Sequence, residues 1–249
     1  LRIYRDRSRR LGGELHGVRS DAERDQAAVT ARVREFQREL FRPLSSEQRD
    51  AKLVEWIDDP LPVVKLAALG IVKSRIADEG KRPEGDVPPA LLRLLKHDSA
   101  AVRREALQIL QNLSDPSVVE GVLARVGEEK DATTRQALFQ ALGKLGTPAA
   151  VPALTREIAS TASSPDCVRE AALALSQIAA KPESKDSLRE AASTLPERYR
   201  SLPADALVLR AALLTAMAGI GDPSFTPDFV AAVEADDAVI LPAALRGLR

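Results

Sequence analysis

The sequence predicts an all-α protein, a right-handed solenoid of stacked helical hairpins with an extra helix at its N-terminal end. A two-residue pair, usually an apolar residue followed by a basic one, recurs at intervals of 38, 32, 34, 41 and 31 residues. Apolar or small residues follow each pair at helical spacing, and a turn that carries an acidic residue precedes it. Repetition with a period of roughly 20 to 50 residues is typical of solenoid architectures.

The recurring pair opens a helical pattern. In the clearest copy, Val102 is followed by Ala106 and Leu110, which is the spacing of one face of an α-helix. Asp98 in the preceding turn is placed to accept hydrogen bonds from the first N–H groups of this helix. One repeat later, Gly146 is expected to end a helix in the left-handed conformation. The six pairs are Val64-Lys65, Val102-Arg103, Thr134-Arg135, Val168-Arg169, Leu209-Arg210 and Ile240-Leu241.

A second apolar-periodic segment lies ahead of each turn, for example at residues 116–126 and 148–158. Both begin with Pro, which is favourable at the first helical position because its missing N–H would have had no partner there. Each repeat is therefore predicted to be two antiparallel helices. Because so small a hairpin cannot bury both of its apolar faces alone, neighbouring repeats must stack. We expect the large apolar residues five positions after the first member of each pair, such as Leu107, Phe139 and Leu245, to pack between repeats.

The segment from Asp131 to Leu154, DATTRQALFQALGKLGTPAAVPAL, resembles the second helix of a HEAT repeat running into the first helix of the next. The resemblance is to short bihelical bacterial HEAT repeats, also seen in the phycobilisome-lyase-like HEAT group, and it covers about residues 45–249. It implies an armadillo-like α-solenoid of about five and a half repeats, in a bacterial protein whose chain is truncated at the C-terminus. It also implies that the second helices line the concave side.

The resemblance gives a structural role to the basic member of each pair. In HEAT repeats the turn acid and this basic residue form a ladder between neighbouring units, so the resemblance implies the same ladder here. A positive ridge that binds an acidic partner is the alternative, and the sequence leaves both open. The residues concerned are Lys65, Arg103, Arg135, Arg169 and Arg210.

Residues 1–42 do not follow the repeat, and we assign them to a basic arm and an N-terminal helix ahead of a repeat domain at residues 43–249. The helix is predicted at about residues 21–41 and carries one apolar stripe. We expect this stripe to cover the open face of the first repeat, with a coiled-coil or partner-binding helix as the alternative. The stripe consists of Val29, Val33, Phe36 and Leu40.

The arm, LRIYRDRSRR, carries five Arg and one Asp, and residues 1–42 as a whole hold 11 Arg against seven acidic residues. A solvated arm on a cytoplasmic protein is the expected interpretation. The alternative is attraction to anionic lipids beside a membrane anchor that would lie upstream of Leu1.

Composition argues against a nucleic acid as the partner. The chain has 36 basic and 36 acidic residues, and aromatic residues make up only 3% of it. Nucleic-acid binding draws on positive charge at the phosphates and on rings that stack on bases. A neutral chain with few rings is poorly suited to either contact.

The sequence predicts no catalytic residue, no metal site and no cofactor. Its two histidines, His16 and His97, do not lie at a spacing that would supply a second metal ligand. Cys167 is the single cysteine and is expected to be structural. The chain is therefore predicted not to be an enzyme. The alternative is a HEAT-family enzyme, either bilin lyase-like or alkylpurine DNA glycosylase-like.

A row of polar side chains on the second helices of the second to fourth repeats is the candidate binding site. These positions face away from the apolar stripe, and Gln both donates and accepts hydrogen bonds, so such a row suits the backbone of an extended peptide. We expect a non-catalytic scaffold or adaptor that binds a protein partner on its concave surface. The row contains Arg104, Gln108, Gln111, Gln136, Gln140, Lys144 and Gln177.

Overall fold

The computed structural model describes residues 24–113 and 115–249. Within these ranges the regular elements are helices and no β-strand occurs, as the sequence predicts. The chain divides into two compact units, residues 1–91 and residues 92–249. The predicted basic arm lies outside the described residues, and the predicted boundary after residue 42 stays a prediction. In the described ranges, no helix combines the length and the apolar character that a membrane span requires.

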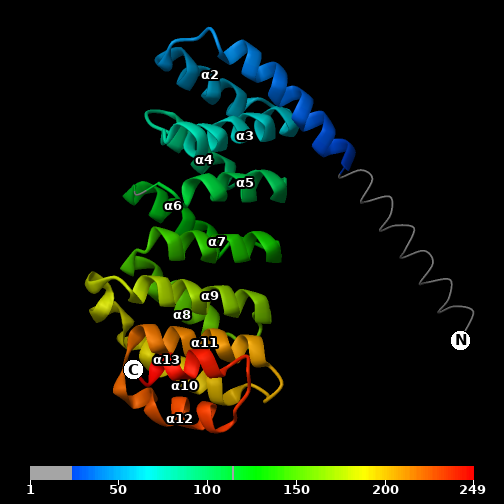
Figure 1. Ribbon diagram of the computed structural model, residues 1–249. Helices are drawn as coiled ribbons and strands as arrows, with labels where there is room; N and C mark the ends of the chain where they lie inside the picture. Colours follow the sequence, from blue (N-terminus) through cyan, green and yellow to red (C-terminus); the bar gives the residue numbers. More distant parts are fainter. Residues whose placement is uncertain (1–23, 114) are drawn as a thin grey trace, which may run out of the picture. The chain divides into compact units, whose positions relative to one another are not determined.

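Unit 1 contains a helix at residues 24–41, followed by α2 (Ser46–Asp58) and α3 (Pro62–Glu79) (Figure 1). Helix α2 begins in a capping box, in which two side chains satisfy early backbone donors. The Ser45 Oγ accepts a hydrogen bond from the Gln48 backbone N–H at 3.3 Å, and the Gln48 Oε1 accepts one from the Ser45 N–H at 2.9 Å. The start of the first repeat is therefore fixed locally.

The helix at residues 24–41 packs within unit 1 through the face that carries Thr30, Gln37 and Phe41 and not through the predicted apolar stripe. Thr30 and Gln37 are buried, and the Gln37 Nε2 donates to the Val64 carbonyl of α3 at 3.3 Å. The prediction that the stripe covers the first repeat is therefore wrong. The two faces are neighbours on the helix, so amphipathicity alone does not decide which of them meets α3. The exposed stripe residues are Val29 (51% exposed), Phe36 (62%) and Leu40 (44%).

Aromatic and cationic side chains join the three helices of unit 1. Trp56 is buried, and its ring centroid lies 6.1 Å from that of Phe41. The Arg75 guanidinium of α3 lies 5.6 Å from the centroid of the Phe41 ring and pairs with Asp50 of α2 at 2.7 Å. One arginine thus contacts both neighbouring helices of the unit.

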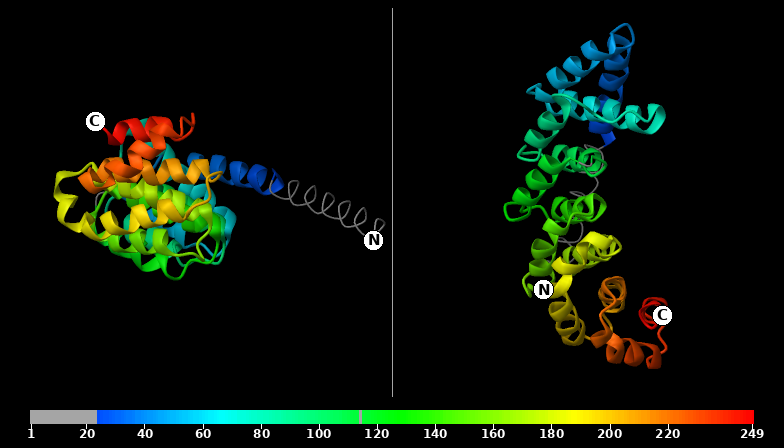
Figure 2. Two further views of the ribbon diagram at one scale, coloured as in Figure 1. Left: turned by 90° about the horizontal axis from the view of Figure 1, so that it is seen from below. Right: turned by 90° about the vertical axis from the view of Figure 1, so that its left-hand side faces the viewer.

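Unit 2 consists of consecutive helical hairpins (Figure 1). The helices are α4 (Val87–Leu94), which crosses the border between the units, α5 (Ala100–Leu110), α6 (Pro116–Val126), α7 (Ala132–Leu145), α8 (Val151–Ala159), α9 (Pro165–Ala179), α10 (Arg189–Ser201), α11 (Leu207–Ile220), α12 (Thr226–Glu234) and α13 (Leu241–Gly247), with 3-10 helices η1 (Pro148–Ala150), η2 (Pro182–Leu188) and η3 (Pro223–Phe225). The second helices form one layer, because α5 packs on α7, α7 on α9, α9 on α11 and α11 on α13. In the right-hand view of Figure 2, this layer lines the inner side of the unit's curve.

Turn side chains cap α7 and α9, whereas α5 begins after Ser99 without a side-chain cap, so the cap expected from Asp98 does not form. Asp131 caps α7, since its Oδ1 accepts a hydrogen bond from the Thr134 backbone N–H at 2.8 Å. Helix α9 is capped by Ser164 instead of a turn acid; its Oγ accepts from a backbone N–H of the first turn at 3.3 Å. Gly146 ends α7 with a φ of 65°, the left-handed conformation predicted for it.

Large apolar residues five positions after the pairs pack between repeats over most of the chain. Leu107 and Phe139 are fully buried, which confirms the expectation for α5 and α7. Leu173 is half-buried. Leu245 departs from the pattern and is 46% exposed in α13, the last helix of the chain. The inner helices are therefore the best covered.

Helices α7 and α9 approach closely at Gly143, where a Cβ atom would lie 2.8 Å from the backbone Cα of Ala174. We expect Gly143→Ala to lower the free energy of unfolding by about 1–3 kcal/mol, because the two helices must move apart. Chemical denaturation measures this loss. Gly127→Ala is the matched control, since Gly127 has a φ of −74° and open space at its Cβ position, and it should be neutral or stabilising by up to about 1 kcal/mol. An equal loss in both variants would contradict close packing at Gly143.

Candidate functional site

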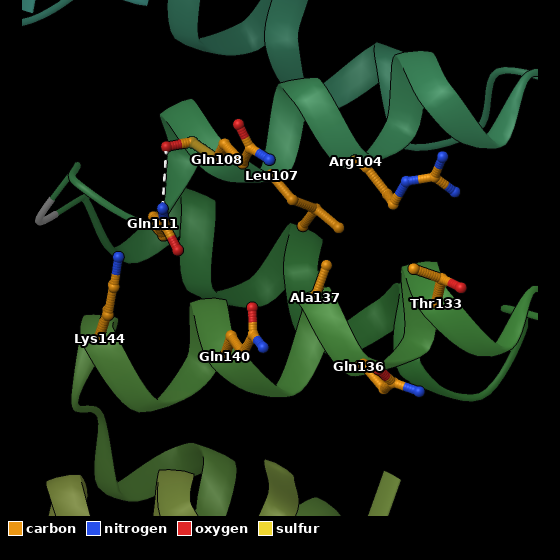
Figure 3. A pocket seen from close by; sticks show the side chains of 9 residues that line it. All are labelled: Arg104, Leu107, Gln108, Gln111, Thr133, Gln136, Ala137, Gln140 and Lys144. Atoms are coloured by element: carbon orange, nitrogen blue, oxygen red, sulfur yellow. Dashed lines mark hydrogen bonds between the residues drawn. The ribbon is translucent and has the colours of Figure 1, made fainter. Parts of the chain in front are cut away.

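A hollow of about 480 Å³ lies on the second-helix layer of unit 2, between α5 and α7 (Figure 3). Two successive repeats contribute to it. The residues that line it are Arg104, Leu107, Gln108, Gln111, Thr133, Gln136, Ala137, Gln140 and Lys144. Six of the seven residues predicted to bind a partner are among them, so the structure gathers most of the predicted row at one place.

The lining is apolar at its centre and polar around it. Leu107 of α5 and Ala137 of α7 lie next to each other in the middle of the hollow (Figure 3). Gln108 and Lys144 are exposed, and Lys144 points toward Gln111 across the gap between the two helices (Figure 3). A bound chain would therefore meet amide and ammonium groups at its edges and the half-buried Ala137 side chain below it, since Leu107 is only 1% exposed.

Hydrogen bonds orient part of the lining. The Arg104 Nη1 lies 3.3 Å from the Asp131 Oδ1, and the Gln140 Nε2 donates to the Glu170 Oε2 at 3.0 Å. The Gln111 Nε2 donates to the Gln108 carbonyl at 3.1 Å. These bonds hold three of the polar side chains in place before any partner arrives. They also show that Gln140 links α7 to α9, so its side chain has a structural role as well.

The structure departs from the predicted row in two ways. Gln177 does not line the hollow; it lies on α9, and its Oε1 is 2.7 Å from the position that a Cβ of Gly143 would take. Leu107, Thr133 and Ala137 line the hollow but were not predicted to do so. Helical spacing marks small and apolar residues as packing residues, so it offers no signal that would have found them.

The basic residues of the pairs do link neighbouring elements, with a different acidic partner from the one expected. The Arg103 Nε and Nη2 donate to the two carboxylate oxygens of Glu129 at 2.8 Å each, and its Nη1 donates to the His97 and Asp98 carbonyls at 2.8 Å. Arg103 thus joins the end of its own first helix to the next repeat. Asp131, the turn acid expected to pair with Arg103, instead contacts Arg104, the residue that follows Arg103 in the sequence.

Arg135 repeats this arrangement one unit later. Its Nη1 donates to the Val126 carbonyl at 2.7 Å, and its guanidinium pairs with Glu157 of α8, where the Nε is 3.3 Å from the Oε1. The Glu157 side chain is only 4% exposed. The acid that pairs with Arg135 belongs to the first helix of the next repeat, whereas Glu129, the partner of Arg103, lies in the turn between α6 and α7. Burial makes this pair important, because the carboxylate has lost its water.

The other three basic residues, Lys65, Arg169 and Arg210, make only part of the contacts expected of the ladder. The Lys65 Nζ donates to the Ile57 carbonyl at 2.7 Å, and the Arg210 Nη1 to the Leu202 carbonyl at 3.3 Å. Both therefore reach back to the end of the first helix of their own repeat. Arg169 differs, because it pairs with Asp166 and Glu170. Among the described contacts, the ion pairs of Arg169 stay within its own helix.

Arginine contacts control the ionisation of Glu129. Burial alone would raise the pKa of Glu129, but the hydrogen bonds from the Arg103 side chain and the Asp131 backbone N–H, with the charges of Arg103 and Arg125, outweigh it and lower the pKa below 4.5. The pKa of Asp131 is lowered as well, mainly by hydrogen bonds from the Thr134 hydroxyl and backbone N–H. Both carboxylates are ionised at neutral pH.

Cys167 behaves as a structural residue. Its side chain is buried, and this burial raises the pKa of its thiol above the ordinary value. A raised pKa disfavours the reactive thiolate. Among the described residues, no group of three or more His, Cys, Asp or Glu side chains is placed to hold a metal ion.

A second hollow, of about 390 Å³, lies on the first-helix side of unit 2, between residues of α4 and α6. Its lining includes the apolar residues Leu92, Leu95 and Ala124 and the cations Arg93 and Arg125. No sequence pattern predicts this hollow, because the first helices carry no row of polar residues that marks one face.

A profile of the HEAT-repeat family matches residues 50–143, 87–167 and 129–207, which together span more than half of the chain. No curated protein matches the sequence. The overlapping matches follow the same repeats that the structure resolves as hairpins.

Solved structures with the same kind of fold include a designed armadillo repeat protein in complex with the peptide (KR)4. It is 14% identical, with a TM-score of 0.57, over 79% of this chain and 97% of that one. The complex of CpcE and CpcF of phycocyanin lyase from Nostoc sp. PCC7120 is 19% identical, with a TM-score of 0.52, over 80% of this chain and 75% of that one. At these identities the similarity shows the fold alone.

Removal of Arg135 should destabilise the protein, because it would leave the buried Glu157 carboxylate without its cation. We expect Arg135→Ala to lower the free energy of unfolding by about 3 kcal/mol, measured by denaturant titration. Arg169→Ala is the control, since Arg169 is one-third exposed and pairs within its own helix, and it should cost about 0–1 kcal/mol. Equal small losses would show that Arg135 is not a link between repeats.

Acid should unfold the protein partly through Glu129. Because its folded-state pKa lies below 4.5, the folded protein keeps this carboxylate ionised at pH values where the unfolded chain binds a proton. The stabilisation is therefore complete above pH 4.5 and is lost as the pH falls through the folded-state pKa. We expect the free energy of unfolding to fall less steeply below pH 4.5 in Glu129→Gln than in the wild type. Glu120→Gln, an exposed change on α6, should keep the wild-type profile, and identical profiles for all three proteins would contradict this account.

Proposed function

Because the chain belongs to the HEAT-repeat family, we propose that it is a non-catalytic protein-interaction scaffold, which binds an extended segment of a protein partner in the hollow between α5 and α7. One observation carries this proposal. Four glutamine side chains and two cations from two successive repeats line a single hollow on the second-helix layer. Because these side chains lie together, one peptide segment can contact several of them at the same time.

The amides of the hollow match the needs of a peptide backbone. Gln108 and Gln136 lie on neighbouring helices, and every Gln amide contains both a donor and an acceptor. An extended peptide exposes N–H and C=O groups along its length, so it can pair with such amides with little demand on its sequence. Ala137, which is half-buried between the amides, provides apolar contact for one side chain of the partner, whereas Leu107 is covered by its neighbours in the fold.

The cations of the hollow favour a partner segment with acidic residues. Lys144 is exposed at one end of the hollow, and Arg104 lies toward the other end (Figure 3). Arg104 shares its charge with Asp131 at 3.3 Å, so Lys144 should contribute most to the attraction of a carboxylate. The partner expected here is therefore opposite in charge to the (KR)4 peptide in complex with the similar designed armadillo repeat protein.

The chemistry of the lining supports a scaffold over an enzyme. Amides do not ionise at neutral pH, and Lys and Arg ordinarily keep their protons there. Groups of this kind bind and orient a ligand but are poorly suited to general acid–base catalysis. The fold similarity to a repeat protein in complex with a peptide supports the same choice.

A random-peptide display selection on the immobilised wild-type chain tests the proposal. We expect the selected peptides to be enriched in Asp and Glu. Binding by fluorescence anisotropy should be at least about tenfold weaker for the variant that combines Gln136→Glu with Lys144→Glu, because two carboxylates would then face an acidic segment. Gln140 is left unchanged, since its hydrogen bond to Glu170 is structural.

Lys185→Glu is the matched control, because Lys185 is exposed in η2, away from the hollow. It reverses a surface charge and should leave the affinity of the selected peptides unchanged. Circular dichroism confirms that each variant is folded. Equal binding by the hollow variant and the wild type, or a selection that enriches no peptide, would rule out the hollow as the binding site.

A further inference from the structure

The helix at residues 24–41 presents its apolar stripe to solvent. Val29, Phe36 and Leu40 are all more than two-fifths exposed, although the residues beside them are buried within unit 1. Surface helices normally bury the apolar face and expose the polar one. Here the helix uses polar contacts, such as the Gln37 hydrogen bond to the Val64 carbonyl, and keeps its apolar face uncovered.

The stripe has the spacing of a coiled-coil seam. The intervals between Val29, Val33, Phe36 and Leu40 are four, three and four residues, which corresponds to the positions d, a, d and a of a heptad. The e positions of this register are Thr30 and Gln37, and both are buried within unit 1. The g positions on the other flank include Arg32 and Glu39, and both of these are exposed.

This register fits a second copy of the same helix in antiparallel orientation. In such a pair Val29 faces Leu40 of the other copy, and Val33 faces Phe36, so the seam is complementary to itself. The g positions face one another in antiparallel pairs. Arg32 of each copy therefore lies opposite Glu39 of the other, which gives two pairs of opposite charge.

A parallel pair does not fit as well. It would set each g position against an e position of the other copy. The e positions Thr30 and Gln37 are neutral and already buried within unit 1, so Arg32 and Glu39 would have no charge opposite them. Charge and burial together favour the antiparallel arrangement.

We infer that the chain forms an antiparallel homodimer through the stripe of the helix at residues 24–41. Four apolar side chains of each copy form the seam, and Arg32 pairs with Glu39 across it. The interface has two-fold symmetry, so the same patch serves both copies. It lies in unit 1, whereas the hollow proposed as the peptide site lies in unit 2, so the two proposals are independent.

Sedimentation velocity of the full chain over a range of concentrations tests this inference. We expect a concentration-dependent dimer in the wild type. Arg32→Glu and Glu39→Arg should each weaken the dimer about tenfold, because each places like charges opposite one another twice. The protein that carries both changes should regain the wild-type dimer, since the opposite-charge pairs are restored with the signs exchanged.

Two further variants complete the test. Glu35→Arg reverses an exposed charge on the same helix away from the seam and should leave the dimer unchanged, whereas Phe36→Asp should abolish it. Circular dichroism reports whether each variant is folded, and the charge exchange remains decisive if Phe36→Asp does not fold. A monomeric wild type, no recovery in the exchanged protein, or an equal loss in Glu35→Arg would overturn the inference.

Discussion

The burial of helix faces against the next hairpin is the interaction on which the rest of the structure depends. A hairpin of this size leaves apolar surface uncovered, and only a neighbouring hairpin can bury it. In unit 2 the second helices meet this need by stacking directly, α5 on α7 and α7 on α9. Gly143 and Ala174 show how close the stacking is, since a single added methyl group would meet the backbone of α9. As a result, the polar residues that face away from the core on these second helices lie side by side in successive repeats.

Arginine adds a polar link to this apolar stacking. Arg103 and Arg135 each satisfy carbonyl groups near the end of one helix and neutralise a buried carboxylate of the next repeat. A buried carboxylate is costly without such a partner. These cations serve the fold, so they add little to the surface charge. The next residue, Arg104, lines the hollow instead, so neighbouring arginines on one helix differ in role.

Much of the fold and of the hollow follows from helical spacing. The repeat predicts the second helices and the face that each turns away from the core, which is why six of the predicted residues line one hollow. Helical spacing does not predict a contact that depends on another segment of the chain. It cannot show that Glu129 and Glu157 supply the carboxylates, because Glu129 lies in the same turn as the expected Asp131 and Glu157 lies on a first helix. It also cannot show that the helix at residues 24–41 packs through Thr30 and Gln37, since both of its faces suit a helix surface.

The hollow between α5 and α7 is the surface proposed to receive a partner. Amide NMR spectra of the full chain, recorded while an acidic peptide is titrated in, locate the bound peptide. We expect chemical-shift changes that centre on Arg104, Gln108, Gln136 and Lys144 and fade along α9. Changes that centre on Leu92, Leu95 and Ala124, in the apolar hollow of α4 and α6, would contradict the proposal.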